Sequence, residues 1–277
     1  MKFRLYREFG ALNSPPIFDA FEQGIKNLGH EVVDNFEDVA VIWSVLWHGR
    51  MQQNQFVYQQ CKNSGKPIII IEVGNLKRGT TWRVCQQHIN GLGFFGNLSN
   101  LDTCRPEKLG VFLQPEKLNR RDEILIATQH AKSLQWQGMP SMEQWVQNTI
   151  EKIRQFSDRK IIVRPHPRSP LRFNIPNATL DLPQKVQGSY DDYNIDYNYH
   201  CVVNFNSGPA VQAAINGTPI VCDSSSLAFP LSDRWENIET PKLPSREDWF
   251  IGLCHTEWTV DEISQGIPLA RIIKNLG

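Results

Sequence analysis

The sequence has 277 residues, which corresponds to about two domains of ordinary size or one large domain. Hydrophobic residues make up 40% of it, with 14 Phe and 8 Trp, so the chain can bury a substantial core and wholesale disorder is excluded. Lys and Arg together number 29, as do Asp and Glu. This balance excludes a uniformly basic coat for nucleic acid but not a local basic patch.

No segment of the sequence predicts a membrane span or a secretory signal. The longest unbroken aliphatic run is Ile68 to Ile71, far short of the roughly 20 apolar residues that a membrane helix needs. Residues 1–7 interleave charged and apolar side chains and lack the apolar core of a signal peptide. The six cysteines include no CxxC pair, which favours free thiols in a reducing cytoplasm and argues against a zinc site.

The first half of the chain alternates predicted strands and helices. Pro15 suits the first position of a helix whose apolar residues recur at helical spacing, and Gly29 ends it. Residues 39–46 are apolar enough for a strand buried on both faces, as in a parallel sheet. Residues 74–115 show no clear period and are interpreted as loops and short elements. Strands are predicted at 2–6, 31–33, 39–46 and 68–73, and helices at 15–28 and 53–62.

A second series of the same kind follows. Residues 142–156 predict an amphipathic helix, and residues 201–204 predict a buried strand that leads into a further helix. Two short helices close the series, and each opens with a capping-box pattern, Ser-x-x-Asp at 245–248 and Thr-x-x-Glu at 259–262. Strands are predicted at 123–128, 161–164, 201–204 and 220–222, and helices at 142–156 and 209–216.

Two consecutive strand–helix series with buried strands predict an α/β protein with two Rossmann-like domains. We expect an N-terminal domain at residues 1–118, a second domain at 119–244, and C-terminal helices at 245–277 with the option of crossing back to the first domain. Ligands of such domains sit at the carboxyl ends of the strands. The cleft between two such halves is therefore the expected site.

The segment from residue 202 to residue 222 carries the strongest local signal. A buried strand runs into Asn206, Ser207, Gly208 and Pro209, and a helix of small residues follows. Free N–H groups and the helix dipole at such a start favour an anion, and Gly208 lets a phosphate approach the backbone. A plain capped helix is the alternative, since helix starts in general need a cap.

A second segment places a histidine between two prolines after a strand. His166 lies between Pro165 and Pro167, with Arg164 and Arg168 on either side. The prolines end the sheet pairing, so the side chains emerge at the carboxyl end of the strand. His166 is suited to donate to a phosphate, and either arginine to neutralise one. The alternative is a structural histidine bonded to a backbone carbonyl.

Together these motifs resemble the donor half of GT-B glycosyltransferases. Arg-Pro-His-Pro at 164–167, followed by Asn-Ser-Gly-Pro at 206–209, is similar to the His-Pro and Ser motifs of capsule-polysaccharide, Kdo-type and sialyl-type transferases. The resemblance covers residues 120 to 230 and implies a GT-B-like fold, with two Rossmann-like domains facing a central cleft. It also implies that His166 and Ser207 bind the donor phosphate.

The same resemblance adds three further donor-binding candidates. Lys132 follows the first strand of this half and would reach a diphosphate. The alternative, a solvated lysine on a loop, fits the sequence at least as well. Ser224 belongs to a polar stretch after the strand at 220–222 that would line the donor-sugar pocket, or simply form a turn. Gln212 stands near the place where UDP-sugar transferases carry a ribose-binding Glu.

In the N-terminal half, two residues are candidates for a general base. Glu72 directly follows four isoleucines, and a carboxylate at the end of a buried strand can be desolvated until its pKa approaches neutrality. A salt bridge from Glu72 to Arg78 or Arg83 is the alternative. His48, after the strand that ends near Trp47, is the second candidate base.

The loop after Glu72 holds the candidates for acceptor binding. Tryptophan stacks on sugar faces and on bases, while lysine and arginine bind phosphates or acidic sugars. The alternative is a loop tryptophan anchored in the core with solvated charges around it. The candidates are Lys77, Arg78, Trp82 and Arg83.

These observations predict transfer of a sugar from a nucleotide-sugar donor to a hydroxyl acceptor. The resemblance implies inversion at the anomeric carbon. No DxD motif occurs in the donor half, so we expect no metal, and no cofactor apart from the nucleotide-sugar substrate. The acceptor is a cell-surface glycan or a hydroxymethylated base of phage DNA, since phages encode compact GT-B enzymes. In the latter case the enzyme would work in the host cytoplasm.

Two other functions remain open at this point. The donor half also resembles the non-hydrolysing UDP-GlcNAc 2-epimerases, which start the corresponding helix with Ser-Gly-Gly. Those enzymes carry carboxylates just after that turn, where this sequence has Gln212, Ala213 and Ala214. The other alternative is a sugar-nucleotide-binding module without catalysis.

Overall fold

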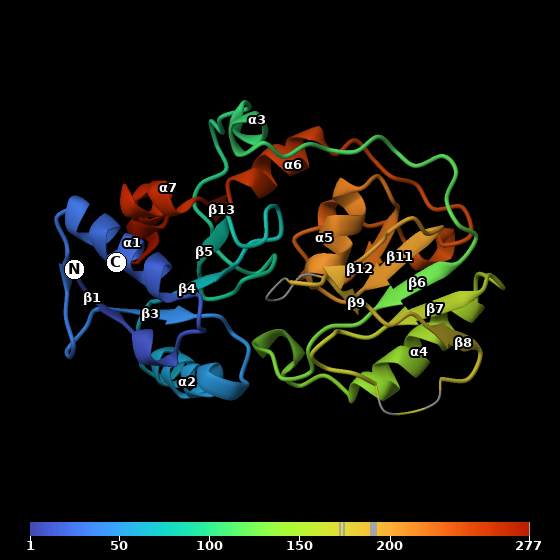
Figure 1. Cartoon of the computed structure of the whole chain (residues 1–277), viewed down its shortest axis with the longest axis horizontal. Coiled ribbons are helices and arrows are strands. Elements are labelled where there is room, and N and C mark those ends of the chain that lie inside the picture. The colour runs from blue at the N-terminus through green and yellow to red at the C-terminus, as the bar shows by residue number, and fades with distance from the viewer. Residues whose placement is uncertain (172, 174, 189–192, 277) are drawn as a thin grey trace. The chain divides into compact units, whose positions relative to one another are not determined.

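The computed structural model describes residues 1–171, 173, 175–188 and 193–276, and it divides into two compact units (Figure 1). Unit 1 comprises Met1–Val111, Lys132–Gln135 and Ile251–Gly277, and unit 2 comprises Phe112–Ala131 and Trp136–Phe250. Each unit carries its own sheet, so the two predicted Rossmann-like halves and the α/β class are confirmed. The boundaries predicted at residues 118 and 244 stay a prediction.

Unit 1 is built on a sheet in the order β13-β5-β4-β3-β1-β2. The strands β1 to β4 run parallel, β5 is antiparallel to β4, and β13 is antiparallel to β5. The chain runs from β1 to β2 on one side and returns to β3 on the other, which makes the β1–β3 pair a topological switch point. The strands are β1 Lys2–Leu5, β2 Glu31–Val32, β3 Val39–Trp43, β4 Ile68–Val73, β5 Trp82–Gln86 and β13 Glu257–Trp258.

The helices of unit 1 come from both ends of the chain. They are α1 Pro15–Asn27, α2 Asn54–Ser64, α3 Arg105–Leu109, α7 Val260–Ser264 and α8 Ile267–Ile272. Phe18 and Phe21 of α1 share one core with Ile263 of α7 and Ile272 of α8. The predicted capping box of Thr259 and Glu262 is confirmed at the start of α7.

Arg105 ties the C-terminal segment to the rest of unit 1. Its buried guanidinium donates to the carbonyl oxygens of Cys254 and Glu257 at 2.5 and 2.6 Å. It also pairs with Glu262 at 2.6 Å and lies 4.1 Å from the ring centre of Trp258. These bonds satisfy a buried charge from several sides, as burial requires.

Glycine at position 24 allows α1 and α7 to approach closely. A Cβ on Gly24 would lie 2.4 Å from the carbonyl oxygen of Ile263. We expect Gly24→Ala to lower the free energy of unfolding by about 1–3 kcal/mol, measured by urea denaturation, because the helices must move apart. A Cβ on Gly252 of α6 (Glu247–Cys254) would meet no atom within 4 Å, so Gly252→Ala is the control and should be neutral or stabilising. Equal stability of Gly24→Ala and wild type would contradict this packing.

Unit 2 is built on a parallel sheet in the order β12-β11-β6-β7-β8. The chain runs from β6 to β7 and β8 on one side, then continues with β11 on the other, so the switch point lies between β6 and β11. The strands are β6 Ile124–Ala127, β7 Ile161–Arg164, β8 Ala178–Leu180, β11 Cys201–Asn204 and β12 Ile220–Cys222, with a separate antiparallel pair of β9 Gln184–Lys185 and β10 Tyr193–Asn194.

Helices α4 (Met142–Arg154) and α5 (Gly208–Ile215) belong to unit 2. Val146, Ile150 and Ile153 of α4 pack in one core with Val163 of β7 and Val203 of β11. Short 3-10 helices lie at Arg7–Phe9, Gly49–Gln53, Leu134–Trp136, Phe229–Leu231, Trp235–Asn237 and Ile273–Asn275.

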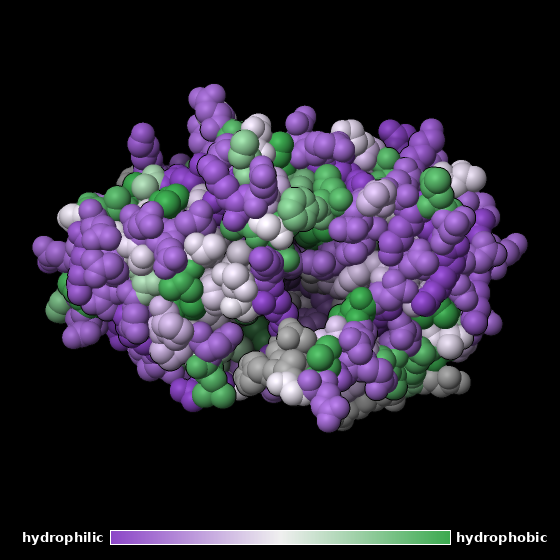
Figure 2. Space-filling model, turned by 45° about the horizontal axis from the view of Figure 1, so that its top comes forward, coloured by the Kyte–Doolittle hydropathy of each residue, from purple (hydrophilic) through white to green (hydrophobic). Residues whose placement is uncertain are grey.

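The surface is polar over most of the face in Figure 2, where apolar residues occur in small groups. Every helix in the described parts of the chain is too short or too polar to cross a membrane. The six cysteines are free thiols, and all except Cys104 are buried. Burial raises the pKa of Cys222 to about 11 and that of Cys254 to about 12, so these thiols stay protonated at neutral pH.

Candidate functional site

The carboxyl ends of β6, β7 and β11 in unit 2 bring the two sequence motifs together. His166 follows β7, and its backbone N–H donates to Oγ1 of Thr128, the residue after β6, at 2.9 Å. Asn204 ends β11, and its amide donates to the carbonyl oxygen of Ala127 at 2.8 Å. The side chains of Thr128 and Asn204 therefore join the three strand ends at the switch point of the sheet.

Asn204 also shapes the turn that starts α5. Its Oδ1 accepts from the backbone N–H of Ser207 at 2.9 Å, and its Nδ2 donates to Ser207 Oγ at 3.1 Å. The N–H of Ser207 thus has a partner within its own turn, and phosphate binding by Ser207 stays a prediction. Sequence reasoning missed Asn204, although its place three residues before the serine is a turn signal.

The start of α5 keeps the features that favour an anion. Ser207 is the N-cap, but its side chain makes no capping bond to the helix, and Pro209 stands in the first turn. Ser207 and Gly208 are both partly exposed. Gln212, half-buried on α5, lies one turn further along. The helix start therefore offers a hydroxyl and a positive dipole end at the same edge of the sheet as His166.

His166 is held in a defined orientation. Its Nδ1 accepts from the backbone N–H of Arg168 at 3.1 Å, so the neutral ring carries its proton on Nε2. The ring of His130 lies edge-on, with ring centres 5.3 Å apart. His166 therefore presents Nε2 as a donor, and the side chain of Arg168 is exposed beside it.

The side chain of Arg164 is engaged inside unit 2. Its side chain is 7% exposed, and its guanidinium pairs with Asp181 at 2.5 Å. It also donates to the carbonyl oxygen of Asp196 at 2.8 Å and to Tyr199 Oη at 3.3 Å. These partners inside unit 2 neutralise and orient the charge of Arg164, and its support of a donor phosphate stays a prediction.

Asn206 belongs to a chain of polar groups at the same edge. Its backbone N–H donates to Gln129 Oε1 at 3.3 Å, and its Nδ2 donates to Ser225 Oγ at 2.8 Å. Ser225 Oγ in turn donates to Asp223 Oδ1 at 2.6 Å. Asn206 is buried, whereas Ser224 is exposed on the turn that follows β12. Asn206 and Ser225 therefore hold the turn after β12 from within the unit, and Ser224 lies on the outer side of this turn.

In unit 1, the strand ends next to the switch point carry Glu72 and Ser44. Glu72 is half-buried near the end of β4, and Ser44 directly follows β3. Ser44 Oγ donates to Glu72 Oε2 at 2.6 Å, and the backbone N–H of Val73 donates to Oε1 at 2.8 Å. Both carboxylate oxygens are thus held, and Ser44 was not recognised from the sequence.

A buried carboxylate shapes the loop between β4 and β5. Glu257 is fully buried, and its two oxygens accept from the backbone N–H groups of Asn75 and Leu76 at 2.5 and 3.0 Å and from Thr81 Oγ1 at 2.8 Å. A Cβ on Gly74 would lie 2.3 Å from Glu257 Oε2, so only glycine leaves room for this carboxylate. The loop is therefore pinned at both of its ends.

The four predicted acceptor residues separate into two pairs. Lys77 and Arg78 are exposed on this loop. Trp82 begins β5, is 7% exposed and packs in the core of unit 1, which agrees with the alternative of an anchored tryptophan. Arg83 lies across from Glu72 in the sheet, but its guanidinium donates to the carbonyl oxygens of Val73 at 3.0 Å and Ile89 at 2.9 Å. The core of unit 1 covers most of the Trp82 ring, and stacking of Trp82 on an acceptor stays a prediction.

His48 and Lys132 lie on neighbouring segments of unit 1. The backbone N–H of Trp47 donates to the carbonyl oxygen of Lys132 at 2.7 Å, and that of Leu134 donates to Val45 at 2.9 Å. His48 is exposed directly after this pairing. Lys132 thus belongs to the unit of the candidate base and not to the unit of the donor motifs.

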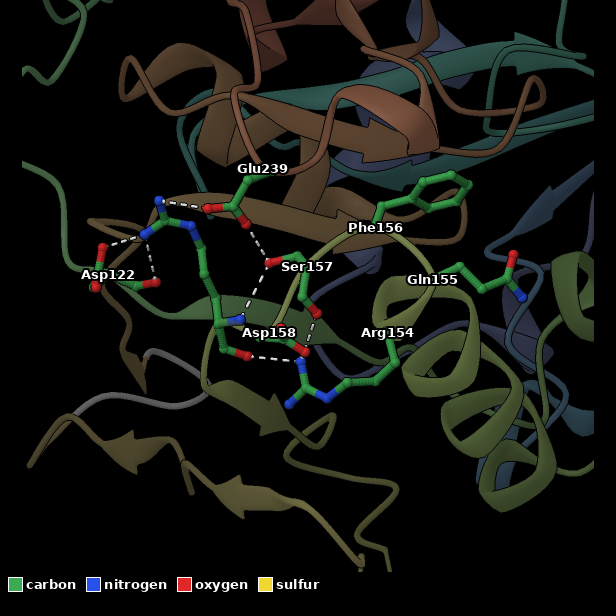
Figure 3. Close-up of a pocket in the computed structure, with 8 residues that line it drawn as sticks. Asp122, Arg154, Gln155, Phe156, Ser157, Asp158 and Glu239 are labelled. Atoms are coloured by element: carbon green, nitrogen blue, oxygen red, sulfur yellow. Dashed lines mark hydrogen bonds and ion pairs between the residues drawn. The ribbon is translucent and has the colours of Figure 1, made fainter.

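A hollow of about 510 Å³ is lined by residues just before β6 and β7 (Figure 3). It thus lies at the amino ends of these strands, whereas both motifs follow carboxyl ends. Arg159 pairs with Asp122 and with Glu239, the latter at 3.0 Å. Ser157 Oγ donates to Glu239 at 2.6 Å, and Arg154 donates to the carbonyl oxygen of Arg159 at 2.8 Å. These bonds and ion pairs hold the turn after α4, so we assign the side chains a structural role. The described residues contain no group of His, Cys, Asp and Glu arranged to hold a metal ion.

No protein-family model and no curated protein sequence matches the chain. Among solved structures, the beta Kdo 2,4 transferase of Thermosulfurimonas dismutans KpsC is similar, with a TM-score of 0.53 and 11% identity over 92% of this chain and 89% of that chain. The beta Kdo 2,7 transferase of KpsC gives a TM-score of 0.49 and 10% identity over 97% and 99%. The UDP-GlcNAc 2-epimerase of Methanocaldococcus jannaschii gives a TM-score of 0.33 and 12% identity, over 99% of this chain and 100% of that chain. The likeness to the first of these shows that this chain has a GT-B-type fold.

Proposed function

We propose that the protein is a glycosyltransferase that moves a sugar from a nucleotide-sugar to a hydroxyl group. The observation that carries this proposal is the switch point of unit 2. There the ring of His166 and the start of α5, which has no side-chain capping bond, lie at the same edge of the sheet. A hydrogen-bond donor and a helix dipole at such an edge suit the phosphates of a nucleotide. The similarity in fold to a Kdo transferase agrees with this assignment.

In this proposal each unit has one task. Unit 2 binds the donor phosphates with His166, Ser207 and Gly208, and Ser224 faces the sugar. Glu72 of unit 1 takes the proton of the acceptor hydroxyl, and His48 is its substitute should Glu72 prove dispensable. Positive groups fixed before the reaction stabilise the departing phosphate, so we propose that no metal is needed and that the anomeric carbon is inverted.

We propose a glycan as the acceptor. Arg83 is engaged with backbone carbonyl oxygens, which leaves Lys77 and Arg78 as the exposed cations of the predicted cluster. A chain of zero net charge with two such cations is poorly equipped for a polyanion. Transfer to hydroxymethylated DNA would reveal itself by a steep fall of activity with salt, whereas transfer to a neutral glycan would not.

Nucleotide binding tests the donor site without knowledge of the acceptor. We expect one of CMP, UDP, GDP or TDP to raise the melting temperature, and a ligand at 100 times its Kd stabilises by about 2.7 kcal/mol. Ser207→Ala should abolish this shift at a small cost in stability, because the Ser207 hydroxyl makes no capping bond and its bonds to Asn204 lie within a partly exposed turn.

Ser141 supplies the matched control. It is also an N-cap serine of unit 2, but its Oγ accepts from the backbone N–H of Gln144 at 3.1 Å. Ser141→Ala should cost about 1 kcal/mol of stability and leave the nucleotide shift intact. No shift with any of the four nucleotides would overturn the proposed donor site.

Two other outcomes would redirect the assignment. Conversion of UDP-GlcNAc in the absence of acceptor would identify an epimerase, although Gln212 stands where those enzymes carry carboxylates. Nucleotide binding without transfer to any acceptor would identify a binding module.

A further inference from the structure

Ser44 has a backbone conformation that serine rarely adopts. It lies directly after β3, has φ of 61° and is 3% exposed. A non-glycine residue with this left-handed backbone is strained, and such residues persist only where the surroundings hold them in place. Glycine would adopt the same conformation without strain, but it has no hydroxyl group.

The surroundings of Ser44 fix the turn firmly. Its backbone N–H donates to the carbonyl oxygen of Ile71 at 2.8 Å, which extends the pairing of β3 with β4. The buried side chain of Asn54 donates to the carbonyl oxygen of Trp43 at 2.6 Å, just before the turn. Both bonds are made by the peptide group that joins Trp43 to Ser44, so the backbone that enters the strained residue is held in place.

The hydroxyl of Ser44 has its proton aimed at one acceptor. Ser44 Oγ accepts from the backbone N–H of Leu46 at 3.1 Å and donates to Glu72 Oε2 at 2.6 Å. Glu72 Oε1 accepts from the backbone N–H of Val73. Two donors from different strands thus fix the plane of the carboxylate, while each oxygen keeps a second lone pair.

We propose that Ser44 is a positioning residue that orients Glu72 as the base, an inference that rests on the proposed function. In the step concerned, Glu72 takes the proton of the acceptor hydroxyl while the acceptor oxygen bonds to the anomeric carbon. The bond from that carbon to the donor phosphate breaks, and the nucleotide leaves with the electron pair. A carboxylate with one fixed orientation makes this proton transfer faster than one that samples several.

Two substitutions separate the hydroxyl from the strain. Ser44→Gly and Ser44→Ala both remove the donor to Glu72, but only glycine also relieves the left-handed backbone. We expect both variants to lower kcat roughly 10-fold or more with the donor KM unchanged. Ser44→Gly should at the same time be more thermostable than Ser44→Ala.

Gln87 provides the matched control, since it is exposed, follows β5 and has φ of 68°. Gln87→Gly relieves the same kind of strain and should retain full activity. The assay uses the donor sugar of whichever nucleotide stabilises the protein, with a panel of glycan acceptors. Crystal structures of wild type and Ser44→Gly should show a single Glu72 orientation in the first and several in the second.

The outcomes distinguish this inference from the proposed function. An active wild type with full kcat in Ser44→Gly would overturn the positioning role and leave the transferase assignment standing. Loss of kcat in Ser44→Ala but not in Ser44→Gly would also overturn it, because the backbone and not the hydroxyl would then matter. A wild type that transfers no sugar across the panel would overturn the proposed function and this inference with it.

Discussion

Replacing His166 by alanine should lower the rate of transfer by roughly 10²-fold or more while the protein stays folded. The Nδ1 atom of His166 accepts from the N–H of Arg168, so the neutral ring carries its proton on Nε2, the atom that we propose donates to the phosphate. A hydrogen bond to a charged phosphate is stronger than one between neutral groups, and alanine removes it. The measurement is donor KM and kcat, together with the melting temperature.

His200 is the appropriate control for this variant. It also lies in unit 2, and its Nε2 bonds to the carbonyl oxygens of Ile238 and Glu239, both at 3.1 Å. Burial lowers the pKa of His200, so the ring is neutral and its role is structural. His200→Ala should lower the melting temperature with little change in donor KM. The reverse pattern, in which His166→Ala loses stability and keeps its kinetics, would make His166 the structural histidine.

Replacing Glu72 by glutamine should lower transfer by roughly 10²-fold or more while nucleotide binding is retained. Glutamine has the same shape but cannot accept the proton of the acceptor hydroxyl. Its amide can still meet both neighbours, because the hydroxyl of Ser44 can rotate to accept from the new NH₂ group. The fold around the turn should therefore survive, and the nucleotide-induced thermal shift should equal that of wild type.

Glu37→Gln tests whether any loss is specific to position 72. Glu37 lies in unit 1 ahead of β3 and pairs with Lys66 at 2.7 Å. Burial alone would raise the pKa of Glu37, but the bond to Lys66 lowers it below its usual value. This variant should lose some stability and keep full transfer activity. If Glu72→Gln were as active as wild type, Glu72 would not be the base, and His48 would be the next residue to replace.

The strands that the sequence predicts well are those whose burial follows from composition alone. Val39 to Trp43 is apolar at every position, and the structure buries all of it in the middle of the sheet of unit 1. By contrast, β5 and β13 were missed. Strand β5 has polar neighbours. The two residues of β13 become a strand only by pairing with β5, which lies about 175 positions earlier in the chain.

The candidate site shows the same limit at the level of single residues. The motifs around His166 and Ser207 depend on local backbone chemistry, so their place at the strand ends was predictable. The buried ion pair of Arg164 depends on Asp181 from another segment, and no local pattern reveals it. The left-handed backbone of Ser44 could not be predicted either, because a serine in the sequence does not indicate this conformation as a glycine would.

The return of residues 251–277 to unit 1 has a consequence for the nascent chain. As the chain leaves the ribosome, unit 2 is complete once residue 250 has emerged. At that moment β5 still lacks its partner strand β13, and the N–H groups of Asn75 and Leu76 still lack their acceptor, Glu257. The half that is synthesised first is thus the last to finish folding, the reverse of the usual order. At about 5–20 residues per second, the unpaired edge of β5 stays open to wrong partners for on the order of ten seconds, an interval in which a chaperone would be most useful.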